Sequence, residues 1–312
     1  MPSTSSRKVV FAGIASNLAI AGCKYVAAII TSSPAMLSEA FHSTADTGVE
    51  ILLLIGMRRS RRPPDALHPF GHGKLLYFYS LLVAIYIFVV GAGLAAYEGI
   101  RHLLHPELSV RVGWNYGVLA IAAAFEFYSW RIAYREIQKR KDPNETTWDE
   151  IIGSKDPTVF TVFFEDSAGL LGICIAFLGI FLGHVFRNPY FDAVASLLIA
   201  LLLVGVALVL GRETGALLTG ERTNRSRIKK VKQILASYPE VERVGNLLTM
   251  QLGPDQALVT VTIKFGSRLD VVELESVIAR LKDRIQKEDP TITQIFIEPG
   301  VAVDDTGRSK AA

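Results

Sequence analysis

The chain has 312 residues, of which 50% are hydrophobic and only 20% charged, and its mean hydropathy is +0.32. Soluble domains carry about a quarter charged residues, so this chain is short of charge. The high apolar fraction and a net charge of +3 exclude an intrinsically disordered chain, and two cysteines exclude a disulfide scaffold. A balance of 33 basic to 30 acidic residues gives no sign of a nucleic-acid partner.

Six long apolar segments follow one another in the first two thirds of the chain. They cover residues 9–31, 36–57, 75–98, 113–134, 159–183 and 190–211. Each is near the ~20 residues with which a helix crosses a bilayer. We therefore predict a membrane all-α domain, a six-helix transmembrane bundle over residues 1–211 that is embedded in the lipid bilayer.

The basic residues of the connecting loops predict the orientation of this bundle. The connections between the second and third segments and between the fourth and fifth segments together hold ten Lys or Arg, and the other three connections hold three. Basic loops stay on the cytoplasmic side. Both termini are therefore expected in the cytoplasm.

The composition becomes polar from about Glu221. Residues 225–238 predict a basic amphipathic helix and residues 271–287 a second helix, while 247–252, 258–265 and 291–298 predict strands. The order α-β-β-α-β indicates a small cytoplasmic α+β domain of ferredoxin-like type over residues 212–303, with its helices on one face of a sheet. Residues 304–312 are expected to form a disordered tail.

Groups of ionisable residues interrupt the second and fifth apolar segments, where burial in a membrane costs free energy and makes such residues functional candidates. The second segment contains Glu39, His42 and Asp46, and the fifth contains Glu165 and Asp166. The spacing places His42 and Asp46 on nearly the same helix face, where both side chains can bind one divalent metal ion. The alternative is a hydrogen-bonded polar cluster that only holds helices together.

Two further groups are weaker candidates. Glu126 in the fourth segment is expected to act either as a proton carrier or as a hydrogen-bond partner between helices, and Glu39 is a further candidate for a proton-carrying or auxiliary role. The loop after the second segment contains Asp65, His68 and His72. A carboxylate and two imidazoles within eight residues can chelate a metal ion. They also fit a structured turn whose histidines cap the next helix or face solvent.

These segments resemble the cation diffusion facilitator family of divalent-metal/proton antiporters, of the zinc-transporter type. The matching sequence motifs are Glu39-Ala-Phe-His42-Ser-Thr-Ala-Asp46, His68-Pro-Phe-Gly-His72-Gly-Lys74, Asp166-Ser-Ala-Gly and Phe191-Asp192-Ala-Val-Ala-Ser. The resemblance covers nearly the whole chain, and four segments in order are far more specific than a single His-x-x-x-Asp.

The resemblance implies that His42, Asp46 and Asp166 bind the transported ion. The family's usual fourth ligand falls on Val162, which cannot coordinate a metal. Glu165 is the nearest replacement, as in the branch with a Glu-Asp pair that includes the mitochondrial type. Asp65, His68 and His72 match a second metal site that some bacterial members carry in this loop.

The resemblance further implies a homodimer formed through the C-terminal domain, and efflux of a divalent cation in exchange for protons. Zn²⁺ is the expected ion, with Fe²⁺, Mn²⁺ or Co²⁺ as alternatives because the ligand set is rich in carboxylates. No histidine follows His184, so the dimer is expected without a bridging metal. We expect no resident cofactor, no enzyme activity and a bacterial inner membrane location. The chain lacks the His-Glu-x-x-His motif of an intramembrane metalloprotease, which argues against that class of enzyme. A non-transporting metal sensor or scaffold with the same fold is the remaining alternative function.

Overall fold

The computed structural model describes residues 4–106, 113–140, 155–267 and 269–300. The chain divides into two compact units, which are described separately. The helical unit comprises Met1–Arg59, Phe78–Ile152 and Pro157–Gly215, and the C-terminal unit comprises Ser60–Tyr77, Gly153–Asp156 and Ala216–Ala312. The loop between the second and third helical segments thus belongs to the same unit as the C-terminal domain.

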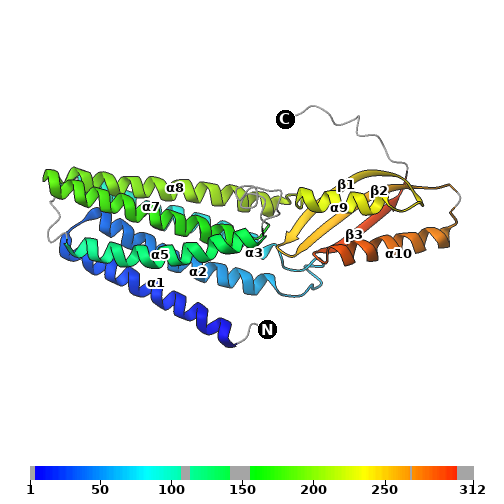
Figure 1. Ribbon diagram of the computed structural model, residues 1–312, viewed down its shortest axis with the longest axis horizontal. Coiled ribbons are helices and arrows are strands. Elements are labelled where there is room, and N and C mark those ends of the chain that lie inside the picture. Colours follow the sequence, from blue (N-terminus) through cyan, green and yellow to red (C-terminus); the bar gives the residue numbers. More distant parts are fainter. Residues whose placement is uncertain (1–3, 107–112, 141–154, 268, 301–312) are drawn as a thin grey trace, which may run out of the picture. The chain divides into compact units, whose positions relative to one another are not determined.

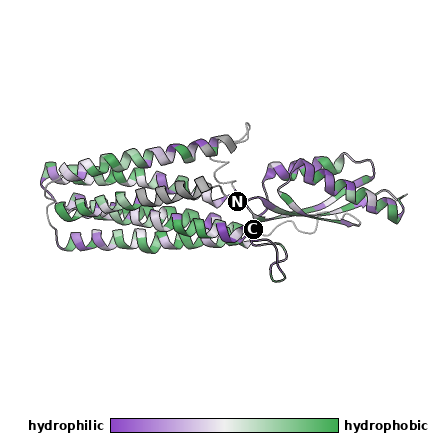
Figure 2. Cartoon of the chain, turned by 90° about the horizontal axis from the view of Figure 1, so that it is seen from below, coloured by the Kyte–Doolittle hydropathy of each residue, from purple (hydrophilic) through white to green (hydrophobic). Residues whose placement is uncertain are grey.

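Each predicted apolar segment lies in a helix (Figure 1). These helices are α1 (Thr4–Thr31), α2 (Pro34–Ser60), α3 (Leu75–Tyr86) with η1 (Ile87–Ala92) and α4 (Gly93–Leu104), α5 (Gly113–Arg140), α7 (Pro157–Phe186) and α8 (Tyr190–Thr219). The third segment is one continuous helical stretch that contains a π-helical turn, η1. Hydrophobic residues dominate these helices in Figure 2.

Among the described residues, three helices are long and apolar enough to cross a membrane by length and composition: Leu75–Leu104, Phe160–Phe186 and Tyr190–Thr219. The described apolar stretch of α1, Asn17–Thr31, is shorter. Ionisable side chains interrupt α2 and α5. The prediction of six spans is thus supported for three helices, and it stays a prediction for α1, α2 and α5.

Helix α8 is longer than predicted, since it continues past residue 211 to Thr219. It ends at Gly220, whose φ of 105° lies in the left-handed region that favours glycine. The N–H of Glu221 donates to the carbonyl oxygen of Ala216 at 3.1 Å and closes the last turn. The last residues of this helix, from Ala216, belong to the C-terminal unit.

The C-terminal domain has the predicted element order. It contains α9 (Arg225–Ala236), β1 (Val241–Gly253), β2 (Gln256–Phe265), α10 (Val271–Glu288) and β3 (Ile292–Pro299). Strand β2 lies between β1, to which it is antiparallel, and β3, to which it is parallel, so the sheet is mixed. The predicted tail, residues 304–312, lies outside the described residues.

One face of the sheet carries the core of this domain. Alternate residues of β2 are buried, from Ala257 to Ile263, and they share a cluster with Leu235 of α9 and Leu281 of α10. Residues two apart in a strand point to the same face. Both helices therefore cover this one face, as predicted. Helix α10 begins with a capping box between Asp270 and Glu273.

Strand β1 begins at Val241, whereas the prediction began it at residue 247. Its register with β2 shifts between Val241 and Arg243 and again between Val244 and Leu247. Such bulges insert unpaired residues and break the two-residue alternation by which a strand is recognised in a sequence. The early part of β1 was therefore missed.

Candidate metal sites

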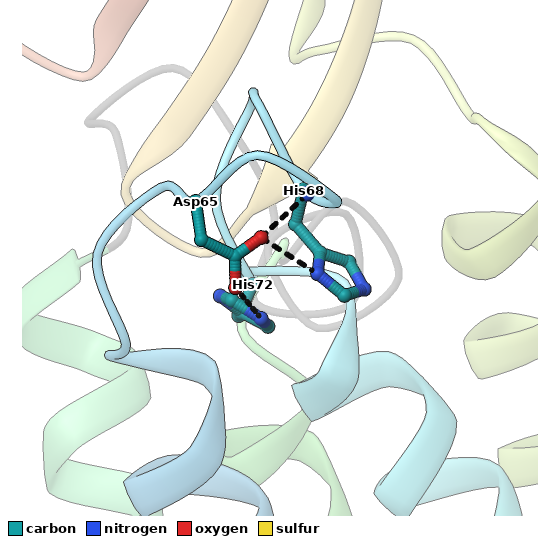
Figure 3. Close-up of side chains that lie close together, drawn as sticks. All are labelled: Asp65, His68 and His72. Atoms are coloured by element: carbon teal, nitrogen blue, oxygen red, sulfur yellow. Dashed lines mark hydrogen bonds and ion pairs between the residues drawn. The ribbon is translucent and has the colours of Figure 1, made fainter.

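Asp65, His68 and His72 lie together in the loop between α2 and α3 (Figure 3). One ligand atom of each lies within 4.8 Å of the other two. Asp65 contacts both imidazoles: Oδ1 lies 3.1 Å from Nδ1 of His68, and Oδ2 lies 3.5 Å from Nε2 of His72. Side chains of Asp65 and His68 are about half exposed, whereas that of His72 is 9% exposed. The cluster is therefore open to ions from solvent.

The backbone of the loop fixes the proton on His72. Its Nδ1 lies 3.2 Å from the carbonyl oxygen of Pro63, which can only accept a hydrogen bond. In the neutral ring Nδ1 therefore carries the proton, which leaves the lone pair of Nε2 for a metal ion. Metal-binding histidines commonly have this second hydrogen bond, which orients the ring.

The carboxylate of Asp65 also shapes the turn. Its Oδ1 accepts hydrogen bonds from the backbone N–H groups of His68, at 2.7 Å, and Leu67, at 3.0 Å. The hydrogen bond from the His68 amide is the main cause that lowers the pKa of Asp65 below its ordinary value. Asp65 is therefore ionised at neutral pH, as a metal ligand must be.

The loop packs on the β1–β2 hairpin within the C-terminal unit. Gly73 lies so close to the carbonyl oxygen of Leu252 that a Cβ atom would collide with it. The next residue, Lys74, donates to the carbonyl oxygen of Leu218 at 3.5 Å. Gly71 supplies a φ of 85° at the turn that precedes His72. The loop that carries Asp65, His68 and His72 and the C-terminal sheet thus belong to one compact unit.

In the helical unit, α2 brings His42 and Asp46 together. His42 Nδ1 lies 3.4 Å from Asp46 Oδ1, and the side chains are 3% and 19% exposed. The other ring nitrogen, Nε2, is buried and has no hydrogen-bond partner among the described residues. A buried nitrogen without a partner is costly unless something binds it. The pair therefore offers ligand atoms to a cation.

Glu39 forms an ion pair with Lys24 of α1. Its Oε2 accepts a hydrogen bond at 3.0 Å from Nζ of Lys24 in α1, and both side chains are fully buried. Nζ of Lys24 also donates to Oγ of Ser43 at 2.7 Å. One acid of the second segment is therefore neutralised by a neighbouring helix.

Asp166 of α7 contacts α5, against which α7 packs. Ser129 donates to Oδ2 of Asp166 at 2.9 Å. Glu165 is buried, and its Oε1 has no partner among the described residues. Glu126 of α5 lies over Gly169, where a Cβ atom would come within 2.8 Å of its Oε2. Glu126 thus occupies space that the glycine leaves open.

The four predicted transport-site residues are not gathered to ligand distance in this conformation. Within the described parts of the chain, the loop trio is the group of three or more His, Cys, Asp or Glu whose ligand atoms all lie within 4.8 Å. His42 and Asp46 meet on α2, whereas Glu165 and Asp166 lie apart from them on α7. A complete site needs these helices to approach.

Helix α8 holds the start of α2, which the sequence did not reveal. Asp192 accepts hydrogen bonds from the backbone N–H of Ala35, at 3.1 Å, and from Oγ of Ser33, at 3.0 Å. Ser38 and Ser196 contact each other through their hydroxyls. Asp192 thus serves the N-terminus of α2 as well as its own helix. A capping residue from another helix leaves no signal in local sequence.

The family models agree with this architecture. The model of the cation efflux transmembrane domain matches residues 10–219, and that of the cation efflux protein cytoplasmic domain matches residues 224–299. The chain therefore belongs to the cation diffusion facilitator family, which confirms the resemblance seen in the motifs.

Individual relatives are transporters of different metals. A mouse (Mus musculus) protein, the mitochondrial proton-coupled zinc antiporter SLC30A9, is 32% identical over 84% of this chain and 46% of its own length. The manganese efflux system protein MneP of Bacillus subtilis is 21% identical over 94% of this chain and 95% of its own. The chain spans slightly under half the length of the mitochondrial antiporters of mouse, frog and human.

Proposed function

We propose that the chain exports a divalent metal cation across a membrane in exchange for protons, and that Zn²⁺ is its principal ion. The observation that carries this proposal is the contact between the buried His42 and the partly buried Asp46, which offers an unpartnered imidazole nitrogen inside the helical unit. Membership of a cation efflux family supports it. The printed name of the mouse relative, a proton-coupled zinc antiporter, supports the choice of ion and of coupling.

The proposed site combines His42 and Asp46 of α2 with Asp166 and Glu165 of α7. Metal ions and protons compete for the same lone pairs on imidazole and carboxylate. An ion that enters from the cytoplasm displaces protons from these ligands. Movement of α2 and α7 against the other helices then opens the site to the opposite side, where protons displace the metal. This cycle needs no covalent step, so the function that we propose is that of a transporter and not of an enzyme.

Manganese export is the second candidate. The ligand set has one imidazole and two or three carboxylates, and oxygen ligands suit Mn²⁺. The Bacillus subtilis manganese efflux protein matches this chain over nearly the full length of both. Fe²⁺ and Co²⁺ stay as further alternatives on the same ligand chemistry.

The remaining assignments complete the proposal. Asp65, His68 and His72 form a second metal site in the loop, and Glu126 carries protons between site and solvent. All six helical segments span the bilayer of a bacterial inner membrane, with both termini in the cytoplasm. The C-terminal domain forms a homodimer without a bridging metal, which the match to the family's cytoplasmic domain supports.

Purified protein in liposomes that enclose a pH-sensitive dye tests the transport site. Addition of Zn²⁺ should drive proton movement with the wild type, and His42→Ala or Asp46→Ala should abolish it. His184→Ala is the matched control, because this exposed histidine at the end of α7 lies outside both sites. Near-normal flux in both site variants would overturn the assignment. Metal binding without any flux would favour the sensor or scaffold.

A further inference from the structure

Lys24 is a fully buried cation in the C-terminal third of α1, next to the helix that carries the proposed metal pair. Its ammonium donates to Glu39 Oε2 at 3.0 Å and to Ser43 Oγ at 2.7 Å. The ion-paired side chains of Lys24 and Glu39 are both 0% exposed. This is a built contact between α1 and α2, with ideal hydrogen-bond lengths for a charged donor.

The contact brackets His42. Glu39 lies three residues before His42, and Ser43 directly follows it. An ammonium that bridges residues 39 and 43 therefore spans the helical turn on which the imidazole sits. The charge of Lys24 also attracts the carboxylates of Asp46 and Glu126. Lys24 is thus electrically part of the metal site although it cannot bind a metal.

Glu39 has a second oxygen that points away from Lys24. Oε1 is buried, has no hydrogen-bond partner among the described residues, and lies against Gly172 of α7. A Cβ atom at position 172 would collide with it. Glu39 therefore sits where α1, α2 and α7 meet, and it has spare ligand capacity toward the helix that carries Asp166.

Stability alone does not explain this ion pair. Burying two charges costs several kcal/mol of desolvation per ion, and well-packed apolar residues would serve the fold as well or better. The position of the pair beside His42 and Asp46 gives it a different consequence. The Lys24–Glu39 ion pair determines how many uncompensated negative charges an incoming divalent ion encounters.

We propose that Lys24 is a specificity-determining residue: a tethered cation that occupies Glu39 and keeps this carboxylate out of the metal's coordination. The inference rests on the proposed function, because it takes His42 and Asp46 as metal ligands. Without Lys24, Glu39 adds a hard oxygen ligand and a negative charge to the site. The added oxygen ligand favours Mn²⁺ over Zn²⁺, whereas the added negative charge strengthens the binding of both ions.

Equilibrium binding of Mn²⁺ and Zn²⁺ to the purified full chain tests this by calorimetry. All variants carry His72→Ala, so that the loop does not contribute. Lys24→Gln should shift the Mn²⁺-to-Zn²⁺ affinity ratio about tenfold toward Mn²⁺. Lys24→Gln/Glu39→Gln should return the ratio to within about twofold of the parent, because the carboxylate that Lys24→Gln releases is then absent. Glu98→Gln, a buried carboxylate of α4 paired with Arg101, is the control and should leave the ratio unchanged.

Glu39→Gln keeps the proposal falsifiable if Lys24→Gln does not fold. It leaves the ammonium unopposed beside His42, so both metals should bind about tenfold or more weakly. The double variant should recover that loss. A purely structural pair would change thermal stability and leave the metal ratio unmoved in every folded variant, which would overturn the proposal. Binding is read without transport, so failed transport by the parent would refute the proposed function alone.

Discussion

Replacement of Asp65 by asparagine separates the fold of the loop from its metal chemistry. Asparagine keeps the Oδ1 atom that accepts hydrogen bonds from the amides of Leu67 and His68, at 3.0 and 2.7 Å. It removes the negative charge and the anionic oxygen that lies 3.5 Å from Nε2 of His72. The turn should therefore survive while the metal site loses its only carboxylate.

The size of the effect follows from the position of Asp65. Loss of an outer-shell partner typically weakens metal binding about 10–100-fold. Asp65 contacts both imidazoles and would itself be a ligand, so we expect the loop's Kd for Zn²⁺ to rise at least about 100-fold. Calorimetry in a His42→Ala/Asp46→Ala background isolates the loop site. Asp283→Asn, an exposed aspartate of α10, is the control. An unchanged Kd with Asp65→Asn would refute the proposed loop site.

Three further predictions follow from the contacts. Asp65 has a lowered pKa, so its carboxylate should stay ionised from pH 7.5 to pH 6 and should lose its contribution to Zn²⁺ binding only in more acidic solution, as the Kd measured across this range would show. Gly172→Ala should lower the thermal stability and the metal flux, because the Cβ atom of the new alanine would collide with the Glu39 side chain. Gly205→Ala is the control: the position has open space around it, so this change should be neutral or slightly stabilising. Leu281→Ala in the C-terminal core should cost about 2–5 kcal/mol of unfolding free energy, and Val271→Ala, 72% exposed, should cost far less, as denaturant titration would show.

The helices of the first unit could be predicted from the sequence because long apolar runs form few structures other than helices. The order of elements in the C-terminal domain was readable too, since the strands and helices differ in periodicity. The start of β1 at Val241 was not, because bulges interrupt its alternation. The extension of α8 to Thr219 passes through Arg212 and Glu213, polar residues that look like the end of a span.

The candidate sites divide in the same way. The loop motif is local, so its three ligands could be predicted to lie together. The partners of the buried residues come from distant segments: Lys24 for Glu39, Ser129 for Asp166 and Asp192 for the start of α2. Ser129 lies three residues after Glu126 on α5, a spacing that could have marked it as a polar neighbour. The pairing of Lys24 with Glu39 and that of Asp192 with the start of α2 depend on tertiary packing alone.

The central claim is exchange of a divalent metal for protons, and accumulation of Zn²⁺ in proteoliposomes tests it most directly. A pH gradient with an acidic interior should drive Zn²⁺ inward against its own concentration gradient, and a protonophore should collapse the accumulated metal. Asp46→Asn should prevent accumulation in vesicles that contain the same amount of protein. Zn²⁺ movement that is the same with and without the pH gradient would contradict proton coupling, and no movement of any divalent ion would contradict the transport function itself.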